Sequence, residues 1–296
     1  MGIESKISWT EATFNGWIGC AKVSPGCTNC YAEDLDNRRF GGGHWGVGKD
    51  RKRTGAANWR EPVKWDKACA DKGIRKRVFC SSLSDWLDPE VPVEWLADLL
   101  RLIAATPNLD WLLLTKRPER WRERIEAVRD LGGLNGVAAT WLDGVPPRNV
   151  WVGTTVEDQK RAEERVPALL AIPARVRFLS CEPLLEAVDL WPTLSVTDSN
   201  GEMSGPRVKP DGSPAIDWVI VGGESGPRAR PFDLAWARAI LLQCQEAGVA
   251  VWVKQMGDNP MLDGQPTKEF TAHHGADPTQ WPEDLRVQAL PTPKSR

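Results

Sequence analysis

The chain contains the stretch Asp110-Trp111-Leu112-Leu113-Leu114-Thr115-Lys116, in which an uninterrupted apolar run ends in polar residues. The run has the length of a β-strand, and its lack of polar alternation is typical of a strand that is covered on both faces. A segment with helical spacing follows from Glu119 to Leu131. A strand of this kind followed by a helix is the repeating unit of parallel α/β proteins.

The same unit recurs along the sequence. Further strands are expected at Arg77–Ser82, Asn149–Thr155, Val176–Glu182, Asp217–Glu224 and Val249–Gln255, and further helices at Tyr31–Phe40, Pro92–Ala105, Gln159–Ala171 and Leu234–Ala247. One more strand is expected at the end of the segment from Ile7 to Ile18. We therefore predict an α/β protein with a (β/α) barrel or partial barrel of about six to seven parallel strands, and we rank an open doubly wound sheet second.

This organisation predicts one barrel-like domain over residues 1–260 and an irregular C-terminal wrap over residues 261–296. Within the domain, residues 49–77 form a basic insertion, and residues 192–215 form a surface excursion rich in Gly, Ser and Pro. The sixteen tryptophans are attributed to compositional bias and ordinary core filling.

The formal net charge of −2 does not favour nucleic acid as a partner of the whole chain, but residues 49–77 carry eleven Lys or Arg against four Asp or Glu. A local basic patch can hold phosphates on a nearly neutral protein, and interleaved tryptophans offer stacking planes for bases. The expected nucleic-acid contacts are Lys49, Arg51, Lys52, Arg53, Trp59, Arg60, Lys64 and Trp65. A solvated charged segment is the alternative.

The cysteine usage favours a reducing compartment. The chain has seven cysteines, no apolar run before Trp9 and no run of apolar residues long enough to span a membrane. We therefore expect a cytoplasmic protein without a membrane segment, in which clustered cysteines are metal ligands or catalysts. The remaining cysteines include Cys80, Cys181 and Cys244, which lie in apolar elements and are expected to be small buried hydrophobes.

Three cysteines follow the first predicted strand at the spacing C-x6-C-x2-C, namely Cys20, Cys27 and Cys30. Ser24-Pro25-Gly26 between them indicates a loop. Thiolates suit iron–sulfur clusters, zinc and copper(I), so a loop with three thiols is typical of a metal site. Three ligands leave one position of a tetrahedral metal open for chemistry. The alternative is a structural zinc site that His44 closes, although the paired C-x2-C spacing of zinc ribbons is missing.

Polar residues follow each predicted strand at its carboxyl end. In β/α barrels the loops at that end build the active site, so we expect these residues and the cysteine loop to face one cavity. They are Ser81, Ser82, Asp85, Thr115, Lys116, Arg117, Thr154, Thr155, Glu157, Ser180, Glu182, Gly222, Gly223, Glu224, Ser225, Lys254 and Gln255. Helix caps, tight turns and structural ion pairs are the alternatives for single members of this set.

These residues resemble the three-cysteine family that is associated with phages and prophages. The resemblance spans nearly the whole chain and rests on Gly19–Glu33, Thr115–Glu119, Val156–Glu157, Arg177–Leu184, Val221–Gly226 and Val253–Gly257. That family is in turn similar to radical S-adenosylmethionine enzymes. The second similarity implies that Cys20, Cys27 and Cys30 hold a [4Fe–4S] cluster and that S-adenosylmethionine binds the open iron. Reductive cleavage by an electron donor then yields a 5′-deoxyadenosyl radical.

The resemblance also implies contacts for the cofactor. Ser81, Ser82 and Asp85 are candidates for its methionyl amine, Lys116 or Arg117 for its carboxylate, and Glu157, Glu182 and Glu224 for further contacts. Two departures from the superfamily pattern stand out: the first two cysteines are three residues further apart than in the commonest spacing, and Asn29 replaces the usual aromatic residue. The Gly-Gly-Glu motif also comes late in the chain, so the superfamily's amine-binding role is not transferred to Glu224.

The leading hypothesis is a radical S-adenosylmethionine-like iron–sulfur enzyme that modifies or repairs a nucleic acid or nucleotide. A zinc-stabilised nucleic-acid-binding protein without catalysis is the second. The third is a barrel hydrolase with structural cysteines, in which Glu157, Glu182 or Glu224 acts as acid and base.

Overall fold

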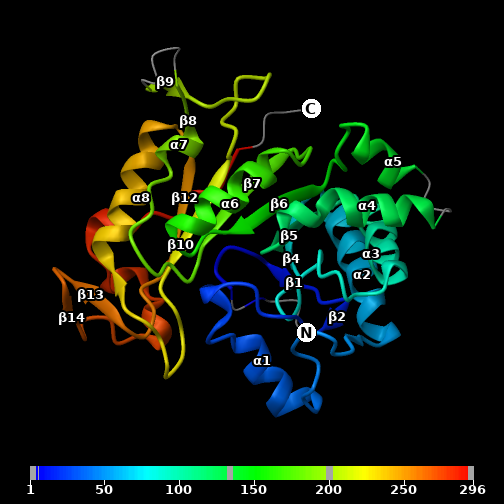
Figure 1. Cartoon of the computed structure of the whole chain (residues 1–296), viewed down its shortest axis with the longest axis horizontal. Helices are drawn as coiled ribbons and strands as arrows, with labels where there is room; N and C mark the ends of the chain where they lie inside the picture. Colours follow the sequence, from blue (N-terminus) through cyan, green and yellow to red (C-terminus); the bar gives the residue numbers. More distant parts are fainter. Residues whose placement is uncertain (1–4, 6, 132–135, 198–202, 293–296) are drawn as a thin grey trace. The chain divides into compact units, whose positions relative to one another are not determined.

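The computed structural model describes residues 5, 7–131, 136–197 and 203–292 (Figure 1). The chain divides into two compact units. Unit 1 comprises Met1–Gly153 and Ala171–Arg175, and unit 2 comprises Thr154–Leu170 and Val176–Arg296.

A seven-stranded parallel sheet is the main element of the fold, and its strand order follows the sequence. The strands are β1 (Ala12–Thr13), β4 (Lys76–Cys80), β5 (Leu109–Thr115), β6 (Val150–Thr155), β7 (Val176–Cys181), β10 (Trp218–Gly222) and β12 (Ala250–Gln255). Sequential order distinguishes a β/α barrel from a doubly wound sheet, in which the order reverses at a switch point. Strands β1 and β12 are the two edges of this sheet and do not pair with each other in the described residues, so the barrel is not closed. The predicted α/β fold is therefore confirmed in its partial-barrel form.

The first strand differs from the prediction. The residues directly before the cysteine loop form β2 (Trp17–Ile18), which pairs antiparallel with β3 (Lys52–Arg53) outside the main sheet. The strand that joins the sheet is β1, which pairs with β4 through Ala12 and Val78. Only two residues of β1 pair, so its apolar pattern is too short to be separated from that of β2.

The helices of unit 1 lie between and after the early strands. They are α1 (Tyr31–Leu35), which continues as the π-helix η2 (Asp36–Phe40), α2 (Ala56–Lys72), α3 (Val93–Ala104), α4 (Trp121–Asp130) and α5 (Val137–Leu142), with the short 3-10 turns η1 (Pro25–Cys27) and η3 (Pro118–Arg120). Helix α4 packs against α3 and α5 (Figure 1).

Most of the basic segment at residues 49–77 is helical, because α2 covers Ala56–Lys72.

The helices follow from apolar spacing. In α3 the buried residues Leu96, Leu99, Leu100 and Ile103 recur at intervals of three and four, which places them on one face. Tryptophans fill much of the remaining interior, as expected. The Trp86 and Trp141 rings stack with their centroids 6.1 Å apart, and further fully buried tryptophans are Trp17, Trp111, Trp218 and Trp281.

Within its described residues, unit 2 contains three α-helices and several short strands and 3-10 helices around its sheet strands. They are α6 (Gln159–Leu170), α7 (Trp191–Leu194), α8 (Leu234–Glu246), β8 (Ser195–Thr197), β9 (Met203–Pro206), β11 (Phe232–Asp233), β13 (Pro260–Leu262), β14 (Gln265–Pro266), η4 (His273–Gly275), η5 (Pro278–Gln280) and η6 (Glu283–Leu285). The expected excursion at 192–215 contains the β8–β9 hairpin, and its residues 198–202 lie outside the described residues. Near the C-terminus, Val253 N donates to Val287 O (2.8 Å), so this segment runs beside β12.

Candidate functional site

The cysteine loop of unit 1 runs from the end of β2 to the start of α1, and it lies against the glycine-rich loop that follows η2. Gly19 has φ +113°, and a Cβ atom there would lie 2.4 Å from the carbonyl oxygen of His44. The backbone of Cys20 forms an isolated parallel β-bridge with that of Trp45, and Gly46 N donates to Cys20 O at 2.9 Å. Only glycine fits at position 19, because both the backbone angle and the close approach exclude a side chain.

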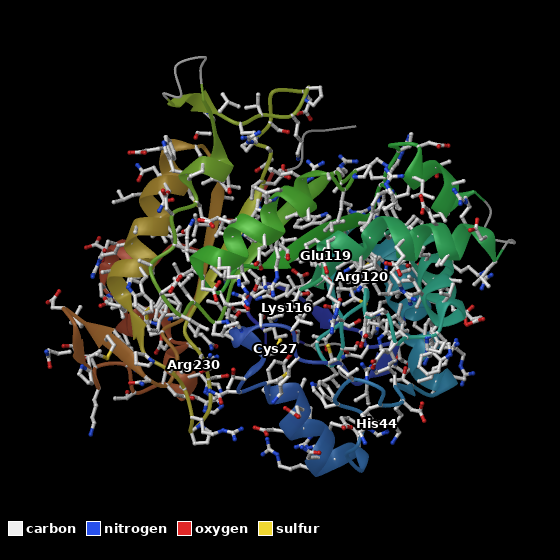
Figure 2. All side chains as sticks on the ribbon, viewed as in Figure 1. Cys27, His44, Lys116, Glu119, Arg120 and Arg230 are labelled. Atoms are coloured by element: carbon white, nitrogen blue, oxygen red, sulfur yellow. The ribbon has the colours of Figure 1, made fainter. Side chains whose placement is uncertain are left out.

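The three cysteines of the loop are half-buried, and none forms a disulfide. Cys27 ends the turn η1, and Cys30 directly precedes α1. Burial raises the pKa of Cys30; the Cys27 thiol acts in the same direction, whereas backbone hydrogen bonds and the Lys116 ammonium oppose it. Cys27 and Lys116 are labelled in Figure 2.

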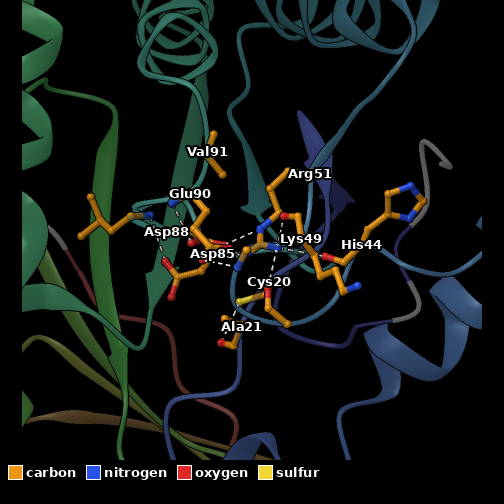
Figure 3. A network of polar contacts seen from close by, with 12 residues as sticks. Cys20, Ala21, His44, Lys49, Arg51, Asp85, Asp88, Glu90 and Val91 are labelled. Carbon is orange, nitrogen blue, oxygen red and sulfur yellow. Dashed lines mark hydrogen bonds and ion pairs between the residues drawn. The ribbon is translucent and has the colours of Figure 1, made fainter.

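A buried ion pair lies beside the first cysteine. Arg117 Nη1 lies 2.9 Å from Asp85 Oδ2 and 3.5 Å from Cys20 Sγ, and Nη2 donates to Ala21 O at 2.7 Å. Burial raises the pKa of Cys20 to about 12, with Asp85 acting in the same direction and Arg117 opposing it. Burial alone would lower the pKa of Arg117. The charges of Asp85 and Cys20 raise this pKa by more than burial lowers it, so the net shift is upward and the guanidinium is charged. Figure 3 shows Cys20, Ala21 and Asp85 in this network.

Both carboxylate oxygens of Asp85 accept hydrogen bonds from neighbouring groups. Besides Arg117, its carboxylate accepts from Thr115 Oγ1 (2.7 Å), Lys116 N (3.0 Å) and Leu87 N (3.0 Å). A carboxylate offers about four acceptor positions, so these four donors saturate it. Through Arg117, Asp85 is linked to the cysteine loop, and any ligand amine would have to displace one of these donors.

The serines after β4 have different surroundings. Ser81 is buried, with its Oγ 3.2 Å from Cys80 Sγ. Ser82 is half-buried; its Oγ accepts from Asn15 Nδ2 (2.9 Å), and its carbonyl accepts from Tyr31 Oη (2.8 Å). Asn15 and Tyr31 were not identified from the sequence as site residues. Tyr31 thereby ties the start of α1 to the end of β4.

The two cations after β5 also differ. Arg117 is buried, and its guanidinium already contacts three acceptors. Lys116 is half-buried, and within the described residues its ammonium makes no hydrogen bond or ion pair. Of the two, Lys116 is the one that can receive an anionic ligand.

A second buried network fixes the glycine-rich loop. The Arg51 side chain is fully buried; it donates to Asp88 (2.8 Å), to Glu90 (2.5 Å) and to the carbonyl oxygens of His44, Gly46 and Lys49. Figure 3 shows these partners around the guanidinium. Arg51 therefore holds the loop from inside and is not exposed to a nucleic acid, contrary to the prediction. Its partners could not be assigned from sequence, because Asp88 and Glu90 lie almost forty residues away.

His44 has a partner other than the cysteines. Its Nδ1 lies 2.8 Å from Oδ1 of the buried Asp36, and in Figure 3 the ring points away from Cys20. In the part of the chain that the structure describes, no three side chains of His, Cys, Asp or Glu lie close enough together to hold a metal ion. This holds for the three cysteines with or without His44, and what the structure shows for His44 alone is its pairing with Asp36.

The loop offers thiol donors, the ligand type that iron–sulfur clusters and zinc both use. It offers three thiols, none of them oxidised to a disulfide, with a buried guanidinium beside the first. The hydroxyl of Ser84, whose backbone forms a bridge with Gly19, is buried and makes no hydrogen bond within the described residues. A buried hydroxyl without a partner is a polar atom that a bound group could satisfy.

In unit 2, the carboxylates at the strand ends are each paired with a cation. Glu157 is buried and accepts from Arg165 Nη1 at 2.7 Å, and Glu224 accepts from Arg230 Nη2 at 2.6 Å. Glu182, after β7, pairs with Lys254 of β12. Gly222 lies on β10 between their strands, and a Cβ atom there would be in ordinary contact with Glu182 Cγ at 3.5 Å. Acid–base chemistry by these carboxylates would require breaking an ion pair.

The remaining basic candidates lie on the surface of unit 1. Lys52 donates to Phe40 O (2.9 Å), and Arg53 pairs with Asp98 (2.6 Å) while its guanidinium covers the Trp59 ring at 4.6 Å. Lys49, Arg60 and Lys64 are exposed. Trp65 is buried and Trp59 half-buried, so Trp65 is not available for base stacking, contrary to the prediction.

No helix within the described ranges is both long and apolar enough to cross a membrane. Comparison with curated proteins and with solved structures gave no match. A family model described as "protein of unknown function (DUF5131)" matches residues 4–282, which is nearly the whole chain. The chain therefore belongs to the DUF5131 family.

Proposed function

We propose that this protein is an iron–sulfur enzyme of the radical S-adenosylmethionine type and that Cys20, Cys27 and Cys30 are its cluster ligands. The observation that carries the proposal is the cysteine loop itself: three reduced, half-buried thiols after the first sheet strand, the first of them beside a buried cation. In the described residues the three thiols do not lie together as a ligand group, so cluster binding would draw them together. When bound, such a cluster would pass an electron from a donor to S-adenosylmethionine and cleave it.

Two residues near the loop have the right chemistry for the amino-acid part of S-adenosylmethionine. The Lys116 ammonium lies near Cys30 and would pair with a carboxylate. The half-buried Ser82 offers a hydroxyl after β4, where the resemblance places the amine contact. Asp85 would contribute indirectly by holding Arg117 and the β5 terminus. Contacts from Glu157, Glu182 and Glu224 remain predictions.

Anaerobic reconstitution tests the cluster. We expect a brown protein with roughly four irons and four sulfides per chain, which cleaves S-adenosylmethionine when reduced. Replacing Cys27 by Ser should abolish iron binding, because it removes one of three ligands. Cys244→Ser is the matched control, since Cys244 is a fully buried thiol on α8 outside the loop. A colourless protein that holds one zinc per chain would contradict the proposal and favour the zinc-stabilised binding protein.

We further propose a nucleic acid or nucleotide as substrate, supported by the outer face of α2. Arg60, Lys64 and Lys67 are exposed and recur at intervals of four and three, opposite the buried Trp65 and Cys69. Glu61 neutralises only Lys64, through an exposed pair at 2.6 Å. Such a stripe offers phosphate contacts without a role in the core.

Salt-dependent binding of an oligonucleotide tests the substrate. We expect that changing Arg60, Lys64 and Lys67 together to Gln weakens binding and flattens the dependence of log K on log salt by about 0.7 to 0.9 for each phosphate that the variant no longer neutralises. The control changes Arg120, Arg122 and Arg129 to Gln, three exposed arginines around α4. Equal effects from the two triple variants would show that α2 is not a binding face.

A further inference from the structure

Arg117 is fixed from two sides in unit 1. Its backbone N–H donates to Thr115 Oγ1 (2.9 Å), and its guanidinium pairs with Asp85, which three other donors also hold. A planar guanidinium group that is already held by an ion pair loses little conformational freedom when it binds a further acceptor. The guanidinium is therefore a rigid donor rather than a mobile surface cation.

The two terminal nitrogens of the Arg117 guanidinium contact the start of the cysteine loop. Nη2 donates to Ala21 O at 2.7 Å, and Nη1 lies 3.5 Å from Cys20 Sγ, within the range of an N–H···S hydrogen bond. The two contacts fasten adjacent residues of the loop to the carboxyl ends of β4 and β5. Cys27 and Cys30, by contrast, are held by local turns of the loop.

The contact between Arg117 and Cys20 also has an electrostatic effect on the sulfur. Arg117 Nη1 contacts both Asp85 Oδ2 (2.9 Å) and Cys20 Sγ (3.5 Å), so the ion pair places a positive charge directly beside the sulfur. Hydrogen bonds to cluster sulfurs and nearby positive charge stabilise the more negative, reduced state of an iron–sulfur cluster. The guanidinium should therefore favour reduction of a cluster at Cys20.

We propose that Arg117 is a positioning residue that anchors Cys20 and raises the reduction potential of the cluster bound there. This inference rests on the proposed function. It assigns Arg117 to the protein's own cysteine loop and not to a carboxylate of the cofactor. The reaction concerned is the one-electron reduction of the cluster, with dithionite as the reductant in the test below.

A redox titration of the reconstituted protein, followed by electron paramagnetic resonance, tests the inference. We expect a lower midpoint potential or a lower iron content in Arg117→Gln, and a smaller change in Arg117→Lys, which keeps the charge but loses the fork. Arg165→Gln is the matched control: Arg165 is equally buried, pairs with Glu157 and donates to a backbone carbonyl. It should retain the wild-type midpoint and iron content.

The outcomes separate the two proposals. If the wild type binds a cluster and both Arg117 variants keep its midpoint and iron content, the role of Arg117 is wrong while the proposed function stands. If the wild type binds no cluster, the proposed function fails and the inference falls with it. If circular dichroism shows that Arg117→Gln is unfolded, Arg117→Lys decides alone: a lower midpoint or iron content supports the role, and unchanged values overturn it.

Discussion

The two units use charged side chains at their strand ends in different ways. In unit 1, the buried arginines Arg51 and Arg117 reach carboxylates after β4 and also hold backbone carbonyls of the irregular loops between β2 and β3. In unit 2, Glu157 and Glu224 pair with arginines only eight and six residues away. The charges of unit 1 thus fix the segments that carry the cysteines, whereas those of unit 2 mainly satisfy one another.

The largest difference should appear in stability. We expect Arg51→Met to lower the free energy of unfolding by about 3–5 kcal/mol, because it leaves Asp88 and Glu90 without their buried partner. Lys254→Met, which breaks the pair with Glu182 in unit 2, should cost less, because both of these side chains keep partial contact with solvent, whereas the Arg51 side chain has none. Chemical denaturation followed by circular dichroism measures both. Similar losses in the two variants would remove the distinction between the units.

A smaller effect is expected from the glycines that end β10 in unit 2. A Cβ atom on Gly223 would lie 2.4 Å from the carbonyl oxygen of Met256, whereas one on Gly222 would meet its nearest atoms at 3.4 Å. Gly223→Ala should therefore cost about 1–3 kcal/mol through overpacking against backbone, and its neighbour Gly222→Ala much less. Thermal unfolding of the two variants compares them directly. If Gly223→Ala unfolds like the wild type, close backbone packing does not explain the Gly-Gly-Glu motif.

The sequence predicted the strands well where burial determines them. The run at Asp110–Lys116 became β5 (Leu109–Thr115), and the run at Val249–Gln255 became β12 (Ala250–Gln255), because each contains four consecutive apolar residues, at 111–114 and at 250–253. In α2, Pro62 and a dense set of charges hid a helix whose buried residues are only Pro62, Trp65 and Cys69. Its apolar face was too narrow to detect.

The candidate site was predictable in part. The three cysteines and the polar residues after β4 and β5 follow from spacing and from the strand–helix repeat. The interior position of Arg51 does not, because a Lys- and Arg-rich run is usually solvent-exposed and its buried partners are distant in sequence. Arg117 is a similar case: its contact with Cys20 spans ninety-seven residues, and no local pattern indicates it.

The smallest effect is expected at a buried thiol of unit 2. Burial raises the pKa of Cys244 on α8 to about 12. The folded thiol therefore stays protonated while the unfolded one ionises near pH 9, so raising the pH favours the unfolded state. Between pH 9 and pH 10 this one group should lower the free energy of unfolding by about 1 kcal/mol.

Cys244→Ala should remove that increment. The variant loses some stability at every pH, because the side chain is fully buried, but its stability should fall less steeply from pH 9 to pH 10 than that of the wild type. Ile240→Val is the control, since it trims the same buried face of α8 without removing a titratable group. Urea titrations at the two pH values measure the difference. An unchanged slope in Cys244→Ala would mean that the Cys244 thiol ionises as readily in the folded chain as in the unfolded one, which its complete burial argues against.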